Sequence, residues 1–149
     1  MRAVIQRVSE ASVTVEGKVV GQIGAGLCAL VGVADGDAEA DAQWLATKVL
    51  ELRIFEDEQG KMNRSLLDTK GQLLAISQFT LLGDARQGRR PGFSAAALPD
   101  VAQPLYARFC AIARAGGVTV AEGIFRATMT VRIVNEGPVT LLLDSKKLF

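Results

Sequence analysis

The sequence predicts a single α+β domain made mainly of antiparallel β-sheets, or a β-barrel, flanked by two helices. Apolar and polar residues alternate over the first third of the chain, which is the pattern of half-buried strands. Two later stretches, 37–52 and 99–114, repeat their apolar residues at helical spacing instead. No repeat, linker or low-complexity run divides the 149 residues, so we expect one domain over 1–149.

The opening sheet is predicted from three runs of alternating residues. These runs are AVIQRV, SVTVEGKVVGQI and LCALVGV, and Glu16-Gly17-Lys18 occupies the position of a hairpin turn. The glycines of GQIGAG stand in the order GxxGxG with no helix after them, so they fail the dinucleotide-binding fingerprint. We interpret them as strand ends.

Two helices are expected to cover the sheet. The first spans 37–52, with Asp37 as its N-cap. One helical stripe consists of Trp44, Leu45, Lys48, Val49 and Leu52. The second begins near Pro99 or Asp100 and ends at Arg114. Its buried face consists of Leu105, Phe109, Ile112 and Ala113.

The rest of the chain contains further strands and one exposed loop. We expect a short strand in RIFEDEQGKMN with a turn at Gly60, and one long, largely buried strand in GQLLAISQFTLL. The composition of GDARQGRRPGFS indicates a surface loop. Three strand-like runs, VTVAEGIF, ATMTVRIV and VTLLLDS, close the chain, and a turn at 135–138 joins the last two.

The composition excludes several classes of function. With a net charge of +1, the chain lacks the basic field of a protein that coats nucleic acid. With no histidine and two cysteines, it excludes Ser-His-Asp and Cys-His triads and makes a zinc site improbable. We expect Cys28 and Cys110 to lie in the core. We also expect a cytoplasmic location, since no run of residues has the pattern of a secretory signal or a membrane span.

Polar residues interrupt the buried strand at SQFTL, residues 77–81. Alternation would place Gln78 and Thr80 on one face and Ser77 and Phe79 on the other. One interpretation is that these groups bond a neighbouring strand. The other is a small polar site in which Thr80 orients or attacks and backbone amides hold a carbonyl oxygen.

Proline interrupts the closing strands at NEGP, residues 135–138. Pro138 cannot donate to a β-ladder, and a turn with proline in its second half often needs the cis form. Gly137 would let the backbone approach a ligand or a partner chain closely. A purely structural hairpin is the alternative.

The two motifs SQFTL and NEGPVT together resemble the signatures of the D-aminoacyl-tRNA deacylases, SQFTL with NxGPVT. The resemblance covers the whole chain, including AVIQRVSEASVTVEG, RIFEDEQGKMN, RRPGF and GPVTLLLDS. It implies a homodimer that hydrolyses the ester between a D-amino acid and the terminal adenosine of tRNA. It implies no metal or organic cofactor.

The resemblance also implies roles for individual residues. The catalytic set would be Ser77, Gln78, Phe79 and Thr80 around the ester, with Gly137 and Pro138 reaching through a cis peptide into the active site of the other subunit. Phe125 and Met129 match positions near the terminal adenine, and Arg7 matches one that supports the Gly-Pro turn. For these last three, a core or sheet-surface role is the alternative.

The chain departs from the family pattern at three positions. It has FRATM where FGADM or FAADM is frequent, so that Arg126 replaces a small residue and Thr128 an aspartate, and Gly92 stands where serine is frequent. Arg126 is a candidate for a phosphate contact. The loop arginines Arg86, Arg89 and Arg90 are also candidates, and they support a rival hypothesis of a nucleic-acid-binding module without catalysis.

The absence of histidine favours a mechanism based on positioning. We expect backbone amides near Gln78 and Phe79 to stabilise the oxyanion, while the ribose 2′-hydroxyl of the RNA assists attack by water. Attack by Thr80 is the competing mechanism, although its hydroxyl has no adjacent base. Carbonyl groups of Gly137 and Pro138 are expected to exclude L side chains by sterics, which would leave glycyl-tRNA a substrate.

Overall fold

Strand β1 (Arg2–Val15) organises the sheet, because three other strands pair with it. In the computed structural model, which describes residues 1–149, its antiparallel partners are β2 (Lys18–Ile23), β3 (Gly26–Gly32) and β8 (Thr130–Asp144). Beyond β3, the strands β6 (Gln72–Ser77) and β7 (Val120–Glu122) continue the sheet in parallel. The order is β2-β1-β3-β6-β7, with β8 on the other side of β1.

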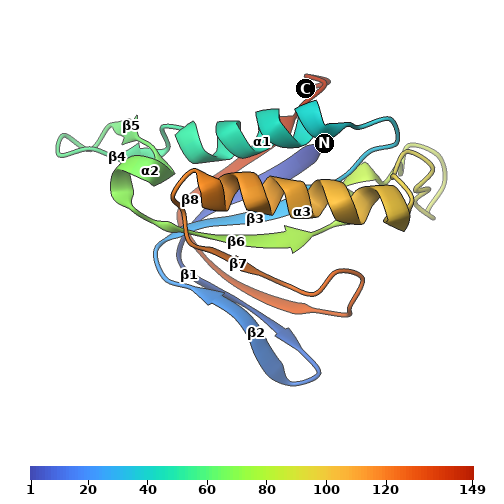
Figure 1. Ribbon diagram of the computed structural model, residues 1–149, viewed down its shortest axis with the longest axis horizontal. Coiled ribbons are helices and arrows are strands. Elements are labelled where there is room, and N and C mark those ends of the chain that lie inside the picture. The colour runs from blue at the N-terminus through green and yellow to red at the C-terminus, as the bar shows by residue number, and fades with distance from the viewer.

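The sheet is mixed and nearly closed. Its two ends approach each other so tightly that a Cβ on Gly21 of β2 would lie 2.6 Å from the carbonyl oxygen of Glu122 on β7. Helices α1 (Glu39–Glu51) and α3 (Pro99–Ala115) lie side by side over one face (Figure 1). The predicted α+β class with two flanking helices is confirmed, and the short helix α2 (Leu66–Thr69) is an addition. Strands β4 (Phe55–Glu56) and β5 (Met62–Arg64) form the hairpin around Gly60.

The core has two parts, one on each face of the sheet. The larger part lies between the sheet and the helices and includes Leu45, Phe109 and Cys110. The smaller part lies inside the curved sheet and includes Cys28. Both cysteines are free and buried, as expected, and burial raises the pKa of each thiol to about 12. None of the helices combines the length and hydrophobicity that a membrane crossing requires.

The first helix differs from the expectation in its cap and its stripe. Its N-cap is Ala38, because Asp37 instead accepts a hydrogen bond from the Ala34 N–H (2.7 Å) and pairs with the Met1 amino group (2.6 Å). Asp41 then satisfies the Ala38 N–H at 2.8 Å. Lys48 is exposed, and Trp44 is only half-buried against the core.

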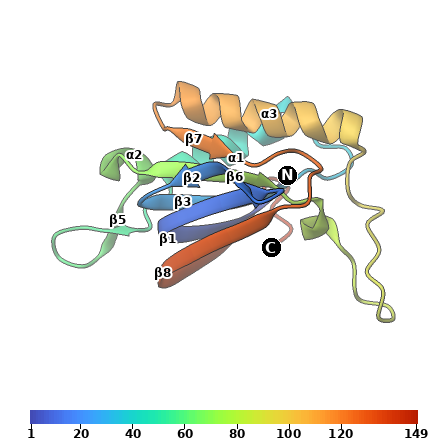
Figure 2. The same cartoon turned by 90° about the horizontal axis from the view of Figure 1, so that it is seen from below.

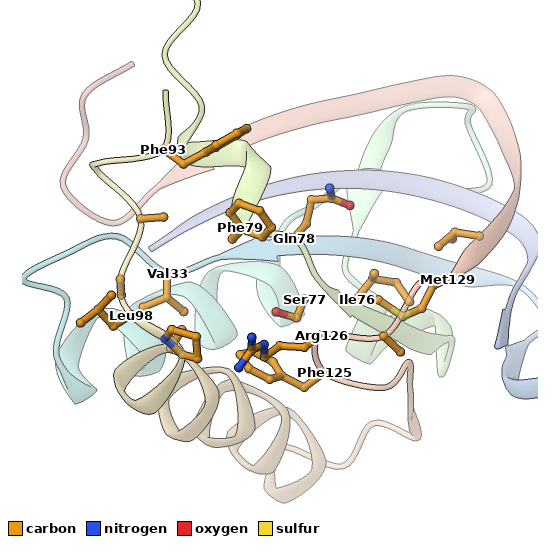
Figure 3. Close-up of a pocket in the computed structure, with 16 residues that line it drawn as sticks. Val33, Ile76, Ser77, Gln78, Phe79, Phe93, Leu98, Phe125, Arg126 and Met129 are labelled. Carbon is orange, nitrogen blue, oxygen red and sulfur yellow. The ribbon is translucent and has the colours of Figure 1, made fainter. Parts of the chain in front are cut away.

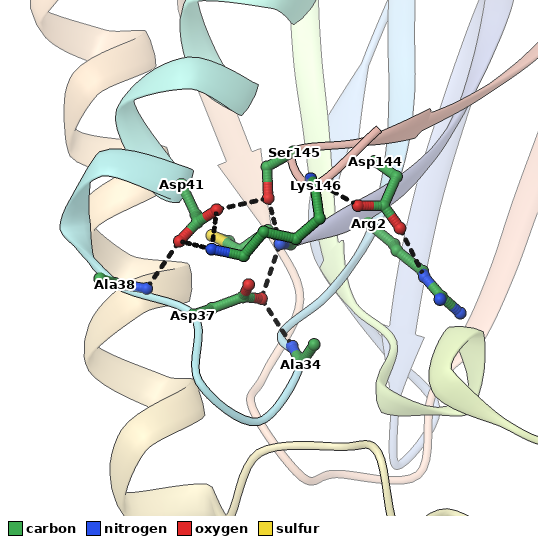
Figure 4. A network of polar contacts seen from close by, with 9 residues as sticks. Arg2, Ala34, Asp37, Ala38, Asp41, Asp144, Ser145 and Lys146 are labelled. Carbon is green, nitrogen blue, oxygen red and sulfur yellow. Dashed lines mark hydrogen bonds and ion pairs between the residues drawn. The ribbon is translucent and has the colours of Figure 1, made fainter. Parts of the chain in front are cut away.

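A polar network ties the start of α1 to the segment after β8 (Figure 4). The Asp41 carboxylate accepts hydrogen bonds from the Ser145 hydroxyl at 2.7 Å and from Lys146 Nζ at 3.0 Å. Burial alone would raise the pKa of Asp41, but these hydrogen bonds and that of Ala38 outweigh it and lower the pKa to about 2. Arg2 pairs with Asp144 at 2.9 Å beside this network.

Two predicted strand boundaries are wrong. The run GQLLAISQFTLL does not form one long strand, because β6 ends at Ser77 and a 3-10 helix, η1 (Phe79–Leu82), follows. The NEGP segment is not a hairpin, since both halves of β8 pair with the same strand β1. Gln6 faces Thr140 and Val8 faces Asn135, so residues 136–139 form a bulge opposite Arg7.

Candidate functional site

A cavity of about 550 Å³ opens where β6 ends. Figure 3 shows Phe79 and Phe93 on one side of it and Phe125 and Arg126 on the other, with the Ser77 hydroxyl between them. Most of the residues that line it are apolar. Such a cavity accepts a flat ring against its walls and presents a small number of polar groups at one end.

The end of β6 determines the geometry of the SQFTL segment. The Gln78 N–H donates to the Val31 carbonyl oxygen at 2.7 Å, and the chain then enters the η1 turn. Phe79 is thereby turned outward, 55% exposed, and packs edge-to-face on Phe93 with ring centroids 5.1 Å apart. The expected alternation of faces over 77–81 is therefore wrong, because the segment is not a strand.

The polar groups of this segment have distinct surroundings. Ser77 and Gln78 line the cavity, whereas the Thr80 side chain is exposed and lies outside the lining. The Gln78 amide group contacts the Thr80 hydroxyl. Because the Gln78 N–H is already engaged with Val31, it is not free to stabilise an oxyanion. The N–H groups at the start of η1, those of Phe79 and Thr80, precede any intrahelical acceptor and are the remaining donors.

The opposite wall is held in place by α3. Phe125 packs on Tyr106, with ring centroids 6.4 Å apart, and the Tyr106 hydroxyl donates to the Ala75 carbonyl oxygen at 2.9 Å. Burial raises the pKa of Tyr106 well above its ordinary value, so this hydroxyl keeps its proton. Met129 completes the wall. The predicted residues Phe125 and Met129 therefore share one cavity with Ser77, Gln78 and Phe79.

Arg7 and the bulge form a second group away from the cavity. Arg7 is buried and donates to the carbonyl oxygens of Ile54 (2.8 Å) and Glu136 (3.2 Å). Gly137 has a φ of 130°, and a Cβ there would lie 3.2 Å from Nη2 of Arg7. The Gly137–Pro138 peptide bond is cis, and both residues are exposed. None of these three predicted residues lines the cavity of its own chain.

Side-chain amides and hydroxyls that sequence reasoning missed brace the bulge. Asn135 Oδ1 accepts from the Val139 N–H at 3.1 Å, and Asn135 Nδ2 donates to the Thr140 hydroxyl at 3.0 Å. Gln6 Nε2 donates to the same hydroxyl at 3.1 Å. Asn135 and Thr140 flank the glycine and proline in NEGPVT, and this was the signal that could have identified them.

The basic loop adjoins the cavity through Phe93, another residue that sequence reasoning missed. Arg86 already forms an ion pair, because its guanidinium lies 2.6 Å from the Asp84 carboxylate. The same contact lowers the pKa of the Asp84 carboxyl to about 2. Arg89 and Arg90 are exposed and take part in none of the ion pairs. Two of the three loop arginines are therefore available to an anion.

Known proteins resemble the chain over its whole length. The family described as D-Tyr-tRNA(Tyr) deacylase matches residues 4–144. A D-aminoacyl-tRNA deacylase from Desulforamulus reducens is 58% identical over 149 residues, which is 100% of both chains. One from Thermus aquaticus is 58% identical over 147 residues, covering 99% of this chain and 97% of its own.

Solved structures share the fold. The structure of a protein named c-Myc DNA Unwinding Element Binding Protein superposes with a TM-score of 0.91 at 38% identity, covering 97% of this chain and 98% of its own. A probable eukaryotic D-amino acid tRNA deacylase superposes with a TM-score of 0.79 at 21% identity, covering 95% and 97%. At that identity, the second likeness concerns the fold alone.

Proposed function

Because the chain belongs to the D-Tyr-tRNA(Tyr) deacylase family and is a hydrolase of aminoacyl-tRNA esters, we propose that it performs chiral proofreading in translation. It would release the free amino acid and tRNA from D-aminoacyl-tRNA in the cytoplasm. The observation that carries the proposal is the cavity at the end of β6, which Ser77, Gln78 and Phe79 of the family motif SQFTL line.

The cavity fits the 3′-terminal adenosine of tRNA. Phe79 and Phe93 on one side, and Phe125 and Met129 on the other, offer apolar surfaces for the base. The ester then lies toward Ser77 and Gln78, where β6 ends. This orientation makes Ser77, Gln78, Phe79 and Thr80 the catalytic segment, with Phe125 and Met129 binding the substrate.

The surroundings of Thr80 favour catalysis by positioning. Its hydroxyl contacts only the Gln78 amide, which cannot remove a proton, so Thr80 is a poor nucleophile. The Phe79 N–H at the start of η1 is the better oxyanion donor. We propose that the ribose 2′-hydroxyl assists the attacking water. This hydroxyl belongs to the same nucleoside as the ester, so once the RNA is bound it needs no further loss of entropy to reach the reaction.

The bulge supports a composite site in a homodimer. Gly137 and Pro138 are exposed and do not line the cavity of their own chain, while β8 has a free edge (Figure 2) and Leu142 on it is 61% exposed. A two-fold axis would place each bulge at its partner's cavity. There its backbone would occupy the space of an L side chain, whereas D-aminoacyl and glycyl esters would fit.

A deacylation assay separates this proposal from the nucleic-acid-binding module. Two observations support the hypothesis of a binding module. Arg89 and Arg90 are exposed and unpaired, and one of the related solved structures is of a protein named for binding DNA. The proposed enzyme releases D-tyrosine from D-Tyr-tRNA with many turnovers. A binding module would leave the ester intact even at stoichiometric protein.

A further inference from the structure

Arg126 is the only charged residue that lines the cavity. Its guanidinium lies beside the Phe125 ring and on the side of the cavity opposite Phe79 (Figure 3). The side chain is exposed and takes part in none of the ion pairs of the structure. No group of the protein therefore compensates this charge.

The backbone at Arg126 gives no reason for an arginine. Its φ is +66°, in the left-handed region, and it is the third residue of a turn closed by the Ala127 N–H and the Ile124 carbonyl oxygen at 3.1 Å. Glycine or asparagine is the usual residue at such a position. A long side chain is strained there, and an unexplained strained residue beside a cavity points to a function for its side chain.

We propose that Arg126 binds the phosphate that joins the terminal nucleoside of the RNA to the nucleotide before it. This inference rests on the proposed function, in which the terminal base enters the cavity. A base held between Phe79 and Phe125 carries its own 5′-phosphate to the rim, where the guanidinium lies. The planar fork of arginine matches two phosphate oxygens, and a partly apolar setting strengthens such a contact.

A carboxylate is the other anion that could meet Arg126. It would come from the side chain of D-aspartate or D-glutamate in the substrate. The phosphate is the better candidate, because every tRNA substrate carries it, whereas only two of the D-amino acids carry the carboxylate. Substrates with and without each anion distinguish the two sources.

The test compares Arg126→Gly with the wild type on three esters of D-tyrosine. These are D-Tyr-tRNA, 3′-D-tyrosyl adenosine, and 3′-D-tyrosyl adenosine 5′-phosphate. We expect kcat/KM to fall about 10-fold to 100-fold for the two substrates with a phosphate and to stay unchanged for the nucleoside. Arg126→Lys, which keeps the charge and loses the fork, should be intermediate.

One control variant and one stability measurement complete the design. Arg108→Ala removes an exposed arginine that pairs with Glu39 at 2.9 Å outside the cavity lining, and it should change none of the rates. Arg126→Gly should melt no lower than the wild type, because glycine relieves the left-handed strain. Equal losses on nucleoside and tRNA, or no loss on D-Tyr-tRNA, would overturn the inference. A loss on D-Asp-tRNA, assayed in the same way, with none on D-Tyr-tRNA would also overturn it and assign Arg126 to the carboxylate.

A binding measurement separates failure of this inference from failure of the proposed function. Calorimetry with adenosine and adenosine 5′-phosphate needs no catalysis. The wild type should bind the phosphate form at least about 10-fold more tightly than adenosine, and Arg126→Gly should bind both equally. If the wild type cleaves no ester but shows this preference, the proposed function alone fails. If it shows no preference, the phosphate site is wrong.

Discussion

Arg7 Nε donates a hydrogen bond to the carbonyl oxygen of Glu136 at 3.2 Å, and so β1 holds the bulge of β8 from the neighbouring strand. A second bond from Nη1 reaches the carbonyl oxygen of Ile54 at 2.8 Å. The guanidinium is buried and no carboxylate lies within ion-pair distance. Arg7 therefore supports the bulge from β1 and ties it to Ile54, in addition to the hydrogen bonds of Asn135 and Gln6.

Arg7→Ala should lower both stability and activity. Two carbonyl oxygens lose their donor, which costs about 1–3 kcal/mol in the free energy of unfolding. Urea denaturation measures this loss, and D-Tyr-tRNA hydrolysis should fall further because the bulge loses its support. Arg7→Lys retains the charge and at most part of the bonding, so it should lie between. If Arg7→Ala had the stability and activity of the wild type, the bulge would keep its conformation without Arg7.

Thr80→Val should retain most of the activity, because the hydroxyl is exposed and contacts only Gln78. A loss smaller than tenfold, about 1.4 kcal/mol, is too little for an essential nucleophile. In contrast, a substrate that ends in 2′-deoxyadenosine should react far more slowly. Equal rates for the ribose and deoxyribose substrates, or a trapped acyl-Thr80 ester, would contradict the RNA-assisted mechanism.

Asp41 should make the protein less stable in acid. Its folded pKa of about 2 lies below the ordinary value of 3.8, so its contribution is complete above pH 4 and is lost as the pH falls toward 2. The loss amounts to about 2 kcal/mol. Asp41→Asn should remove this part of the pH dependence of unfolding, whereas Asp35→Asn, at an exposed aspartate, should keep it. Identical pH profiles for the wild type and Asp41→Asn would refute the role of the network.

The alternating strands of the first third of the chain and the two long helices could be predicted from sequence because their patterns are local. The end of β6 at Ser77 could not, since it depends on a hydrogen bond from the Gln78 N–H to Val31, which is far away in the chain. The bulge was likewise misassigned as a hairpin. Its glycine and proline are compatible with both structures, and only the pairing of both flanks with β1 decides between them.

The sequence motifs indicate which residues lie near one another better than they indicate how the chain runs between them. The motif positions Ser77, Phe79 and Phe125 do share one cavity. Phe93 was not foreseen as their neighbour, because only the η1 turn brings Phe79 to it. Residue patterns alone could not place Gly137 and Pro138 outside the cavity of their own chain, and only the family resemblance pointed away from it.

Mixed dimers should show that the site is shared between subunits. One subunit carries Phe79→Asp in the cavity, and the other carries Gly137→Val in the bulge. Each mixed dimer then has one intact cavity that faces one intact bulge. Random mixing of two inactive proteins should therefore restore about a quarter of the wild-type activity. Complete inactivity of the mixture, or an active monomer in sedimentation, would contradict the composite site.

Single-turnover hydrolysis of D-Tyr-tRNA, L-Tyr-tRNA and Gly-tRNA tests most directly whether the backbone of the bulge selects the substrate. If this backbone excludes an L side chain by sterics, the identity of a D side chain matters little, and glycine has no side chain that could clash. We expect D-Tyr-tRNA and Gly-tRNA to be cleaved and L-Tyr-tRNA to be spared. Cleavage of L-Tyr-tRNA at a rate comparable to that of D-Tyr-tRNA, or complete resistance of Gly-tRNA, would contradict selection by the bulge.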